Sequence, residues 1–198
     1  MTALILASGS AIRAQLLRQA GVGFEITPAR IDEQAVKRSL EAEGAPSARV
    51  PEVLAEMKAL RVSESNPGVL VLGADQVLAF EGRVISKSDN LDEARDLLKS
   101  LRGRQHQLLG TAVLARGGAT VWRHREAARL WMRQFSDTFL ESYLAQEGEA
   151  ALAGVGCYRL EGPGAQLFSR IEGDYFSILG LALLPLLAAL REHGVIAS

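Results

Sequence analysis

The chain begins with a short apolar run that passes through a turn of small residues into an amphipathic helix pattern. Leu4–Ala7 has the length and apolar character of a buried strand, and Ser8, Gly9 and Ser10 follow it directly. From Ile12 onward, apolar residues recur with the period of about 3.6 that marks a helix, which Ser10 can cap. A buried strand that turns sharply into a helix is typical of an α/β protein.

Strand and helix patterns alternate along the rest of the chain. The sequence predicts strands over residues 24–27, 69–75, 107–116, 120–134, 157–160 and 166–171, with a hairpin around Glu81-Gly82. Helices are predicted after Pro51, Asn90 and Ser136 and over Leu183–His193, and Ile31–Glu33 is expected in a loop. In the helix after Pro51, the stripe expected to face the core is Val53, Leu54, Met57 and Leu60. Hairpins among the strands favour an α/β fold with a mixed sheet.

Composition limits the compartment and the partners. The 198 residues fit one domain, residues 1–198, or two tightly joined lobes, and the net charge of -1 gives no general attraction to nucleic acid or to an anionic membrane. The single cysteine, Cys157, cannot form an internal disulfide, which favours a cytoplasmic location. The most apolar stretch, Ile178–Leu190, is shorter than the roughly 20 residues that span a bilayer.

The turn after the first strand has the features of an anion site. Backbone N–H groups and the helix dipole point toward a ligand at the start of a helix, and the hydroxyls of Ser8 and Ser10 add donors. Arg13 lies in the first turn of the same helix, within reach of the same anion. The alternative is that the two serines only cap the helix and that Arg13 is solvated.

Carboxylates and amines elsewhere suit a metal-bound polyphosphate. Asp75 ends the buried strand Val69–Asp75, at an edge where open α/β sheets bind ligands, and Glu33 follows another strand. Lys58 interrupts an apolar helix stripe, and Lys87 follows the hairpin. Alone, Asp75 fits a turn as well as a functional site, Glu33 fits a solvated loop, and each lysine is more typical of a solvated surface. Together they offer carboxylates for Mg²⁺ and ammonium groups for phosphate oxygens. Motifs of P-loop and dinucleotide-binding proteins and a zinc-ligand spacing are absent from the sequence.

An ordered set of segments resembles the Maf family of nucleoside triphosphate pyrophosphatases. The resemblance runs from Leu4 to about Leu190 and rests on LILASGSAIRAQLL, IDE, LAEMKA, VLGADQVL, ISKS, RGRQHQLL and GCYRLEGPGAQLFSRIEGDYFSILGLALL. It implies a fold like that of inosine triphosphate pyrophosphatases, with two lobes, an elongated mixed sheet and a central cleft. It also implies cleavage of a nucleoside triphosphate to the monophosphate and pyrophosphate with Mg²⁺, or alternatively Mn²⁺, and a homodimer.

The resemblance implies a role for each matching residue. Asp75 would be the general base and Glu33 an acidic partner of the metal or the water, so that both are expected to bind the metal. The triphosphate would be contacted by Ser8, Ser10, Arg13, Lys58 and Lys87. The base would be selected by Ile12, Gln76 and Glu161.

One departure from the family pattern bears on the substrate. The usual start is close to S-x-S-P-R-R, whereas this chain has Ala11 and Ile12 in place of the proline and the first arginine. A residue other than arginine at that position, together with Glu161-Gly162-Pro163-Gly164, resembles the branch that acts on 7-methyl-GTP. The expected role is clearance of modified or surplus nucleotides. The alternatives are the branch that acts on dTTP and UTP, and a nucleotide-binding regulator of cell division without turnover.

Overall fold

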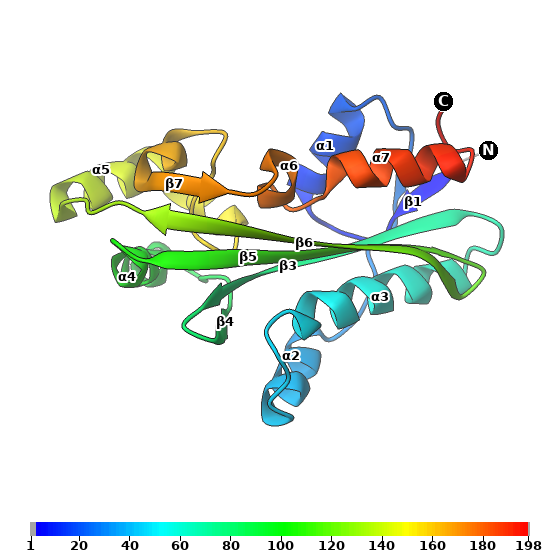
Figure 1. Cartoon of the computed structure of the whole chain (residues 1–198), viewed down its shortest axis with the longest axis horizontal. Helices are drawn as coiled ribbons and strands as arrows, with labels where there is room; N and C mark the ends of the chain where they lie inside the picture. Colours follow the sequence, from blue (N-terminus) through cyan, green and yellow to red (C-terminus); the bar gives the residue numbers. More distant parts are fainter. Residues whose placement is uncertain (1–2, 198) are drawn as a thin grey trace. The chain divides into compact units, whose positions relative to one another are not determined.

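The strands form one mixed sheet in the computed structural model, which describes residues 3–197, so the ends of the expected 1–198 domain lie outside the described residues. Within that range the sheet has seven strands in the order β2-β1-β3-β5-β6-β7, with β4 paired to β3 (Figure 1). The strands are β1 (Leu4–Leu6), β2 (Glu25–Ile26), β3 (Leu70–Phe80), β4 (Arg83–Ile85), β5 (Gln105–Arg116), β6 (Ala119–Met132) and β7 (Phe168–Glu172). β1 runs parallel to β2 and β3, whereas the β3–β4 and β6–β7 pairs are antiparallel, which confirms the mixed sheet.

The helices lie between these strands along the chain. They are α1 (Ala11–Gln19), α2 (Glu33–Ala42), α3 (Arg49–Glu64), α4 (Leu91–Leu101), α5 (Asp137–Glu147), α6 (Tyr175–Ile178) and α7 (Leu183–Glu192), with 3₁₀ turns at Gly148–Ala153 and Pro163–Leu167. The structure divides into two compact units. The first holds the residues up to Gln76, Leu109–Glu126 and those from Asp174 on, and the second holds Val77–Leu108 and Ala127–Gly173.

In the first unit, helices cover both faces of the sheet. α1 and α7 lie on one face and α3 on the other (Figure 1). Alternate residues of a strand pack against the helices on the two faces, because successive side chains of a strand point to opposite faces. Leu70 and Leu72 of β3 pack in the cluster with α1 and α7, whereas Val71 packs with Val62 of α3.

Close approach of α3 to the sheet depends on Gly73. A Cβ atom at this position would overlap the carbonyl oxygen of Ala55 and lie 2.6 Å from the backbone nitrogen of Ala59. Both of these alanines are fully buried, and they form a small cluster with Val113 on β5. The small side chains of the two alanines on α3 and the lack of a side chain at Gly73 on β3 therefore let the two backbones approach closely.

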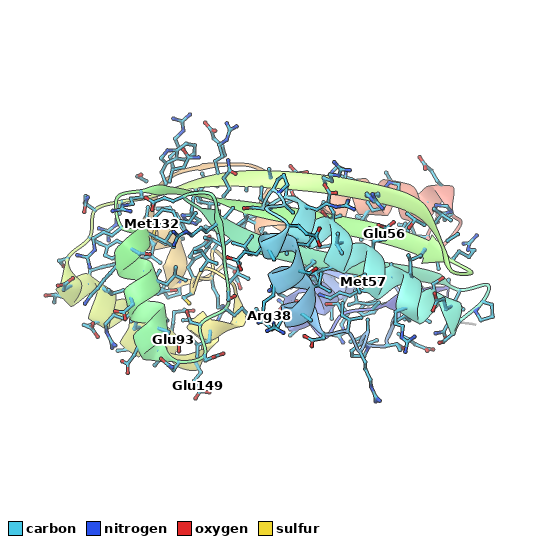
Figure 2. The ribbon with its side chains drawn as sticks, turned by 90° about the horizontal axis from the view of Figure 1, so that it is seen from below. Arg38, Glu56, Met57, Glu93, Met132 and Glu149 are labelled. Atoms are coloured by element: carbon cyan, nitrogen blue, oxygen red, sulfur yellow. The ribbon has the colours of Figure 1, made fainter. Side chains whose placement is uncertain are left out.

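The face of α3 that packs on the sheet differs from the expected stripe. Met57 is 37% exposed, and Figure 2 views α3 from its outer side with Met57 labelled there. Leu54 is buried as expected, but Ala55, Lys58 and Ala59 are buried with it. The inner stripe was wrong because the helix turns its small residues toward the sheet, where Gly73 leaves room.

Three other expectations were wrong and several were confirmed. Asp75 does not end a strand, because β3 continues through it to Phe80, where it pairs with β4. Glu33 begins α2 instead of lying in a loop, because Asp32 accepts a hydrogen bond from Ala35 N and caps the helix. Residues 157–160 form no strand, and Cys157 has a φ of 56°, which extended chain excludes. The hairpin at Glu81-Gly82 and the caps at Asn90 and Ser136 are confirmed.

In the second unit, α4, α5 and the 3₁₀ turn Gly148–Ala153 pack together. An aromatic cluster contains the buried His106 and Tyr158 and the half-buried Phe168, and His106 Nε2 lies 2.7 Å from Tyr158 Oη in a hydrogen bond. No helix among residues 3–197 is long and apolar enough to cross a membrane.

Candidate active site

The carboxyl end of β1 and the middle of β3 (Leu70–Phe80) bring the first predicted residues together. The parallel register pairs Leu6 with Leu72, and Ala7 N donates a hydrogen bond to Leu72 O. Ser8 therefore follows β1 beside Ala74, one residue before Asp75. A turn at the end of β1 then leads into α1, whose first turn carries Arg13.

Arg13 is buried and held by three acceptors. Its Nη1 donates to Ser8 Oγ at 3.2 Å and to Ala74 O at 2.9 Å, and its Nε donates to Gly180 O at 2.8 Å. Burial lowers the pKa of the guanidinium, although the charges of Asp75 and Glu33 oppose the shift. The hypothesis of a solvated Arg13 is excluded.

A second group of predicted residues is linked by a lysine. Lys58 Nζ lies 2.7 Å from Asp75 Oδ1 and 2.8 Å from Glu33 Oε1. The side chains of Lys58 and Asp75 are each 8% exposed, whereas Glu33 is 42% exposed. One buried ammonium thus holds two carboxylates, one from a helix start and one from a strand.

The electrostatics keep Glu33 ionised. Burial alone would raise its pKa, but the hydrogen bond and the charge of Lys58 outweigh burial, with smaller contributions from Lys37 and Arg13. The pKa of Glu33 is consequently lowered. At neutral pH the site therefore contains the cation of Arg13 and the ionised carboxylate of Glu33, which can bind a metal ion or accept a hydrogen bond from a water.

The donor set suits a metal that arrives with a phosphate ligand. Among residues 3–197, no group of three or more His, Cys, Asp or Glu side chains could hold a metal ion alone. Mg²⁺ commonly keeps several waters and binds one or two carboxylates together with substrate phosphates. Asp75 and Glu33, joined through Lys58, fit that pattern.

Three further predicted residues lie near these groups in the first unit. Ser10 stands at the start of α1, but its side chain makes no capping hydrogen bond, and its N–H donates to Ser8 Oγ at 3.2 Å. Ile12 is half-buried in the first turn of α1. Gln76, next to Asp75, donates from Nε2 to Ser177 O at 2.7 Å.

The remaining two predicted residues belong to the second unit. Lys87 is exposed, and its Nζ donates to Ala153 O at 2.8 Å. Glu161 is also exposed and accepts a hydrogen bond from Arg159 Nε at 3.2 Å. Their roles toward the triphosphate and the base stay predictions from the resemblance.

Sequence reasoning missed three contributions from the backbone. Ala74 O and Gly180 O hold Arg13, and Gly73 lets α3 bring Lys58 to Asp75. Carbonyl groups have no residue signature, so only the fold reveals them. Gly73 carried a signal, since a glycine inside an apolar strand run marks a close backbone approach.

Nearly the whole chain matches one family model. The model described as Maf-like protein matches residues 3–193, which include both groups of site residues in the first unit. The chain belongs to the Maf family. The expectation drawn from the ordered segments is confirmed.

Relatives in the Maf family cover almost the full length. A protein of Granulibacter bethesdensis named nucleoside triphosphate pyrophosphatase is 54% identical over 190 residues, 96% of each chain. A Rhizobium meliloti protein named 7-methyl-GTP pyrophosphatase is 50% identical over 193 residues, 98% of this chain and 97% of the other. A Brucella abortus protein with the latter name is 46% identical over 190 residues, 96% of each chain.

Proposed function

We propose that this Maf-family chain hydrolyses a nucleoside triphosphate to the monophosphate and pyrophosphate. The observation that carries the proposal is the cluster in which the buried Lys58 holds the buried Asp75 and the more exposed Glu33, close to the end of β1 and to Arg13. Relatives at about half identity carry the name nucleoside triphosphate pyrophosphatase, which supports the same activity.

Asp75 is placed to activate water. Its Oδ1 accepts the hydrogen bond from Lys58, and its second oxygen can take the proton of a water that attacks the α-phosphorus. Lys58 orients the carboxylate, because an ammonium at 2.7 Å fixes one of its two oxygens. Attack breaks the bond between the α-phosphorus and the bridging oxygen, and pyrophosphate leaves.

Donors at the start of α1 neutralise the phosphate chain. Three hydrogen bonds engage Nε and Nη1 of Arg13, and they fix the plane of the guanidinium so that Nη2 can donate to a phosphate oxygen. Backbone N–H groups of the first turn of α1, residues 11–13, add the favourable end of the helix dipole. A magnesium ion held by Asp75 and Glu33 would supply further charge neutralisation to the phosphate oxygens.

The substrate we propose carries a guanine-like base of the 7-methyl-GTP kind. Two relatives with that name are 50% and 46% identical to the chain. Ile12, half-buried in the first turn of α1, offers an apolar surface where the common family pattern has an arginine. The carboxylate of Glu161 can accept hydrogen bonds from the N–H groups of a guanine edge.

The test is a nucleotide panel with the purified full chain and Mg²⁺. Pyrophosphate release is followed in H₂¹⁸O with 7-methyl-GTP, GTP, dTTP, UTP, CTP and ATP. The masses of both products are measured by mass spectrometry. We expect pyrophosphate without label and a monophosphate that contains ¹⁸O, with 7-methyl-GTP the fastest substrate.

Each of the other possible results would contradict a different part of the proposal. Fastest turnover of dTTP and UTP would move the chain to the other branch of the family. Release of orthophosphate, or label in pyrophosphate, would contradict attack at the α-phosphorus. Tight nucleotide binding without any product would overturn the enzyme and favour a nucleotide-binding regulator.

A further inference from the structure

Residues 174–180 form a short segment that is tied together by one carboxylate. Asp174 Oδ2 accepts hydrogen bonds from Ser177 N at 2.7 Å and from Ser177 Oγ at 2.8 Å. These bonds cap α6, and Gly180 N closes the turn by donating to Ser177 O at 3.0 Å. The segment therefore has a defined shape of its own.

Two side chains of the candidate active site bind the backbone of this segment. Gln76 Nε2 donates to Ser177 O at 2.7 Å, and Arg13 Nε donates to Gly180 O at 2.8 Å. Of the three hydrogen bonds of Arg13 described above, the bond to Gly180 O is the one made outside β3 and the turn after β1. The position of the Gly180 carbonyl consequently helps to set the direction of the guanidinium.

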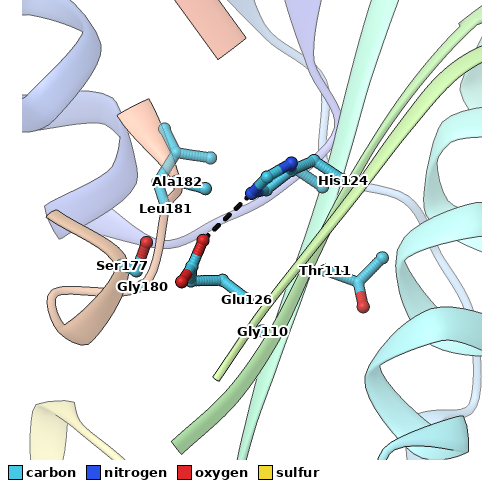
Figure 3. Close-up of a pocket in the computed structure, with 9 residues that line it drawn as sticks. Gly110, Thr111, His124, Glu126, Ser177, Gly180, Leu181 and Ala182 are labelled. Carbon is cyan, nitrogen blue, oxygen red and sulfur yellow. Dashed lines mark hydrogen bonds and ion pairs between the residues drawn. The ribbon is translucent and has the colours of Figure 1, made fainter. Parts of the chain in front are cut away.

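A small gap borders the segment on the side of β5 and β6. Ser177, Gly180 and Leu181 border a gap of about 10 Å³ whose other walls include Glu126 and Gly110 (Figure 3). A gap of that size accommodates about one water molecule. Glu126 is itself fixed by an ion pair with His124 at 3.0 Å. Ser177 and Gly180 are thus bordered by β5 and β6, and Gly180 also by Arg13.

The carbonyl orientation at Gly180 requires glycine. Its φ of 110° lies in a region that residues with a Cβ atom rarely adopt. An alanine there would be strained, and the chain would relax by turning the peptide groups on either side of Cα. That movement would shift the carbonyl away from Arg13 Nε.

We propose that Gly180 and Asp174 are positioning residues that act through Arg13 in triphosphate cleavage. Gly180 supplies the carbonyl that holds Nε, and Asp174 fixes the segment that carries this carbonyl. The inference rests on the proposed pyrophosphatase activity and on the contact of Arg13 with phosphate.

A double-mutant cycle tests whether Gly180 acts through Arg13. The values of kcat and KM for pyrophosphate release are measured for the wild-type chain, Gly180→Ala, Arg13→Lys and the double variant. We expect Gly180→Ala to lower kcat/KM by about 10²-fold, mostly through kcat, as small displacements of a charged group typically do. Arg13→Lys removes the guanidinium, and with it the Nε–H that donates to Gly180 O. In that background Gly180→Ala should lower kcat/KM by less than about threefold, because the group that the carbonyl positions is absent.

Matched variants separate positioning from loss of folding. Gly194, at the end of α7 with a φ of 70°, has no atom within 4 Å of the place that a methyl group would take, so Gly194→Ala should strain the backbone without changing kcat. Asp174→Asn keeps an oxygen acceptor for Ser177 and should retain kcat within about threefold, whereas Asp174→Ala should behave like Gly180→Ala. Urea midpoints show which variants are folded.

The outcomes distinguish this inference from the proposed function. An active wild-type chain with additive effects of Gly180→Ala and Arg13→Lys overturns the positioning role and leaves the pyrophosphatase intact. Equal loss in Asp174→Asn and Asp174→Ala also overturns it. No product from any nucleotide with the wild-type chain refutes the proposed function itself.

Discussion

Lys58 Nζ of α3 and Asp75 Oδ1 of β3 form an ion pair at 2.7 Å, with both side chains 8% exposed. Burying two charges is unfavourable unless they are paired and hydrogen-bonded. Here Glu33 provides a second carboxylate for the same ammonium. The arrangement keeps the carboxylate of Asp75 in one orientation, which suits a general base better than it suits maximal stability.

Replacing Lys58 should destabilise the chain as well as inactivate it. Lys58→Met leaves Asp75 buried without its cation, and we expect the free energy of unfolding at pH 7 to fall by about 3 kcal/mol. Urea unfolding followed by circular dichroism measures the change. Lys99→Met on the exposed surface of α4 removes the same charge and should shift the free energy by less than about 0.5 kcal/mol. Equal stability of the two variants would contradict a buried ion pair.

Gly73 should be intolerant of a single methyl group. In Gly73→Ala the new Cβ overlaps the Ala55 carbonyl, so α3 must move away from β3. Overpacking of this kind costs about 1–3 kcal/mol. The displaced helix also separates Lys58 from Asp75, so pyrophosphate release should fall by about tenfold or more. Gly23→Ala, where no atom lies within 4 Å of the new methyl, is the control, and equal activity of both variants would refute this role.

Much of the framework could be predicted from local patterns. The buried strands at Leu4 and Val69, the hairpin at Glu81-Gly82 and the caps at Asn90 and Ser136 depend on short-range apolar and turn signals, and the structure contains all of them. Local signals failed where tertiary contacts decide. α3 buries Ala55 and Ala59 instead of Met57 because Gly73 faces them, and no property of the helix sequence alone reveals that partner.

The candidate site was predictable in its residue types but not in its connections. Family resemblance named Ser8, Arg13, Glu33, Lys58 and Asp75, and the fold links them in two hydrogen-bonded groups of one unit. Spacing along the chain could not show that one lysine joins two carboxylates. The carbonyls that hold Arg13 were also hidden, because every residue has one.

The buried histidine of the second unit should make stability depend on pH. Burial lowers the pKa of His106 from 6.5 to about 4. Between those values the unfolded chain binds a proton that the folded chain does not, so the free energy of unfolding decreases as the pH falls. The loss that His106 causes approaches about 3 kcal/mol below pH 4 and vanishes above pH 6.5.

Urea titrations at several pH values between about 7.5 and 4 give the free energy of unfolding of the wild-type chain and of His106→Gln. The loss is the difference between the slopes of these two free energies against pH. The slope of His106→Gln should be shallower over the acidic range. Parallel curves for the wild-type chain and His106→Gln would show that His106 takes up its proton equally in the folded and the unfolded chain, which would contradict a lowered pKa.

Metal removal should stop turnover without unfolding the chain. Because Asp75 and Glu33 offer only two carboxylates, the ion needs phosphate ligands and should leave readily in EDTA. We expect EDTA to abolish pyrophosphate release and added Mg²⁺ to restore it, while the urea midpoint in the absence of nucleotide changes little. Full turnover in EDTA would exclude a metal at these carboxylates.

The most direct test of the account is the rate of pyrophosphate release by Asp75→Asn, measured with Mg²⁺ and the best nucleotide beside the wild-type chain. Asparagine preserves the shape of the side chain and can still accept from Lys58, but it cannot take a proton from water. The account predicts a loss of about 10²–10⁴-fold in kcat, with the circular dichroism spectrum of the folded chain retained. Turnover at the wild-type rate would contradict the role of Asp75 as the base.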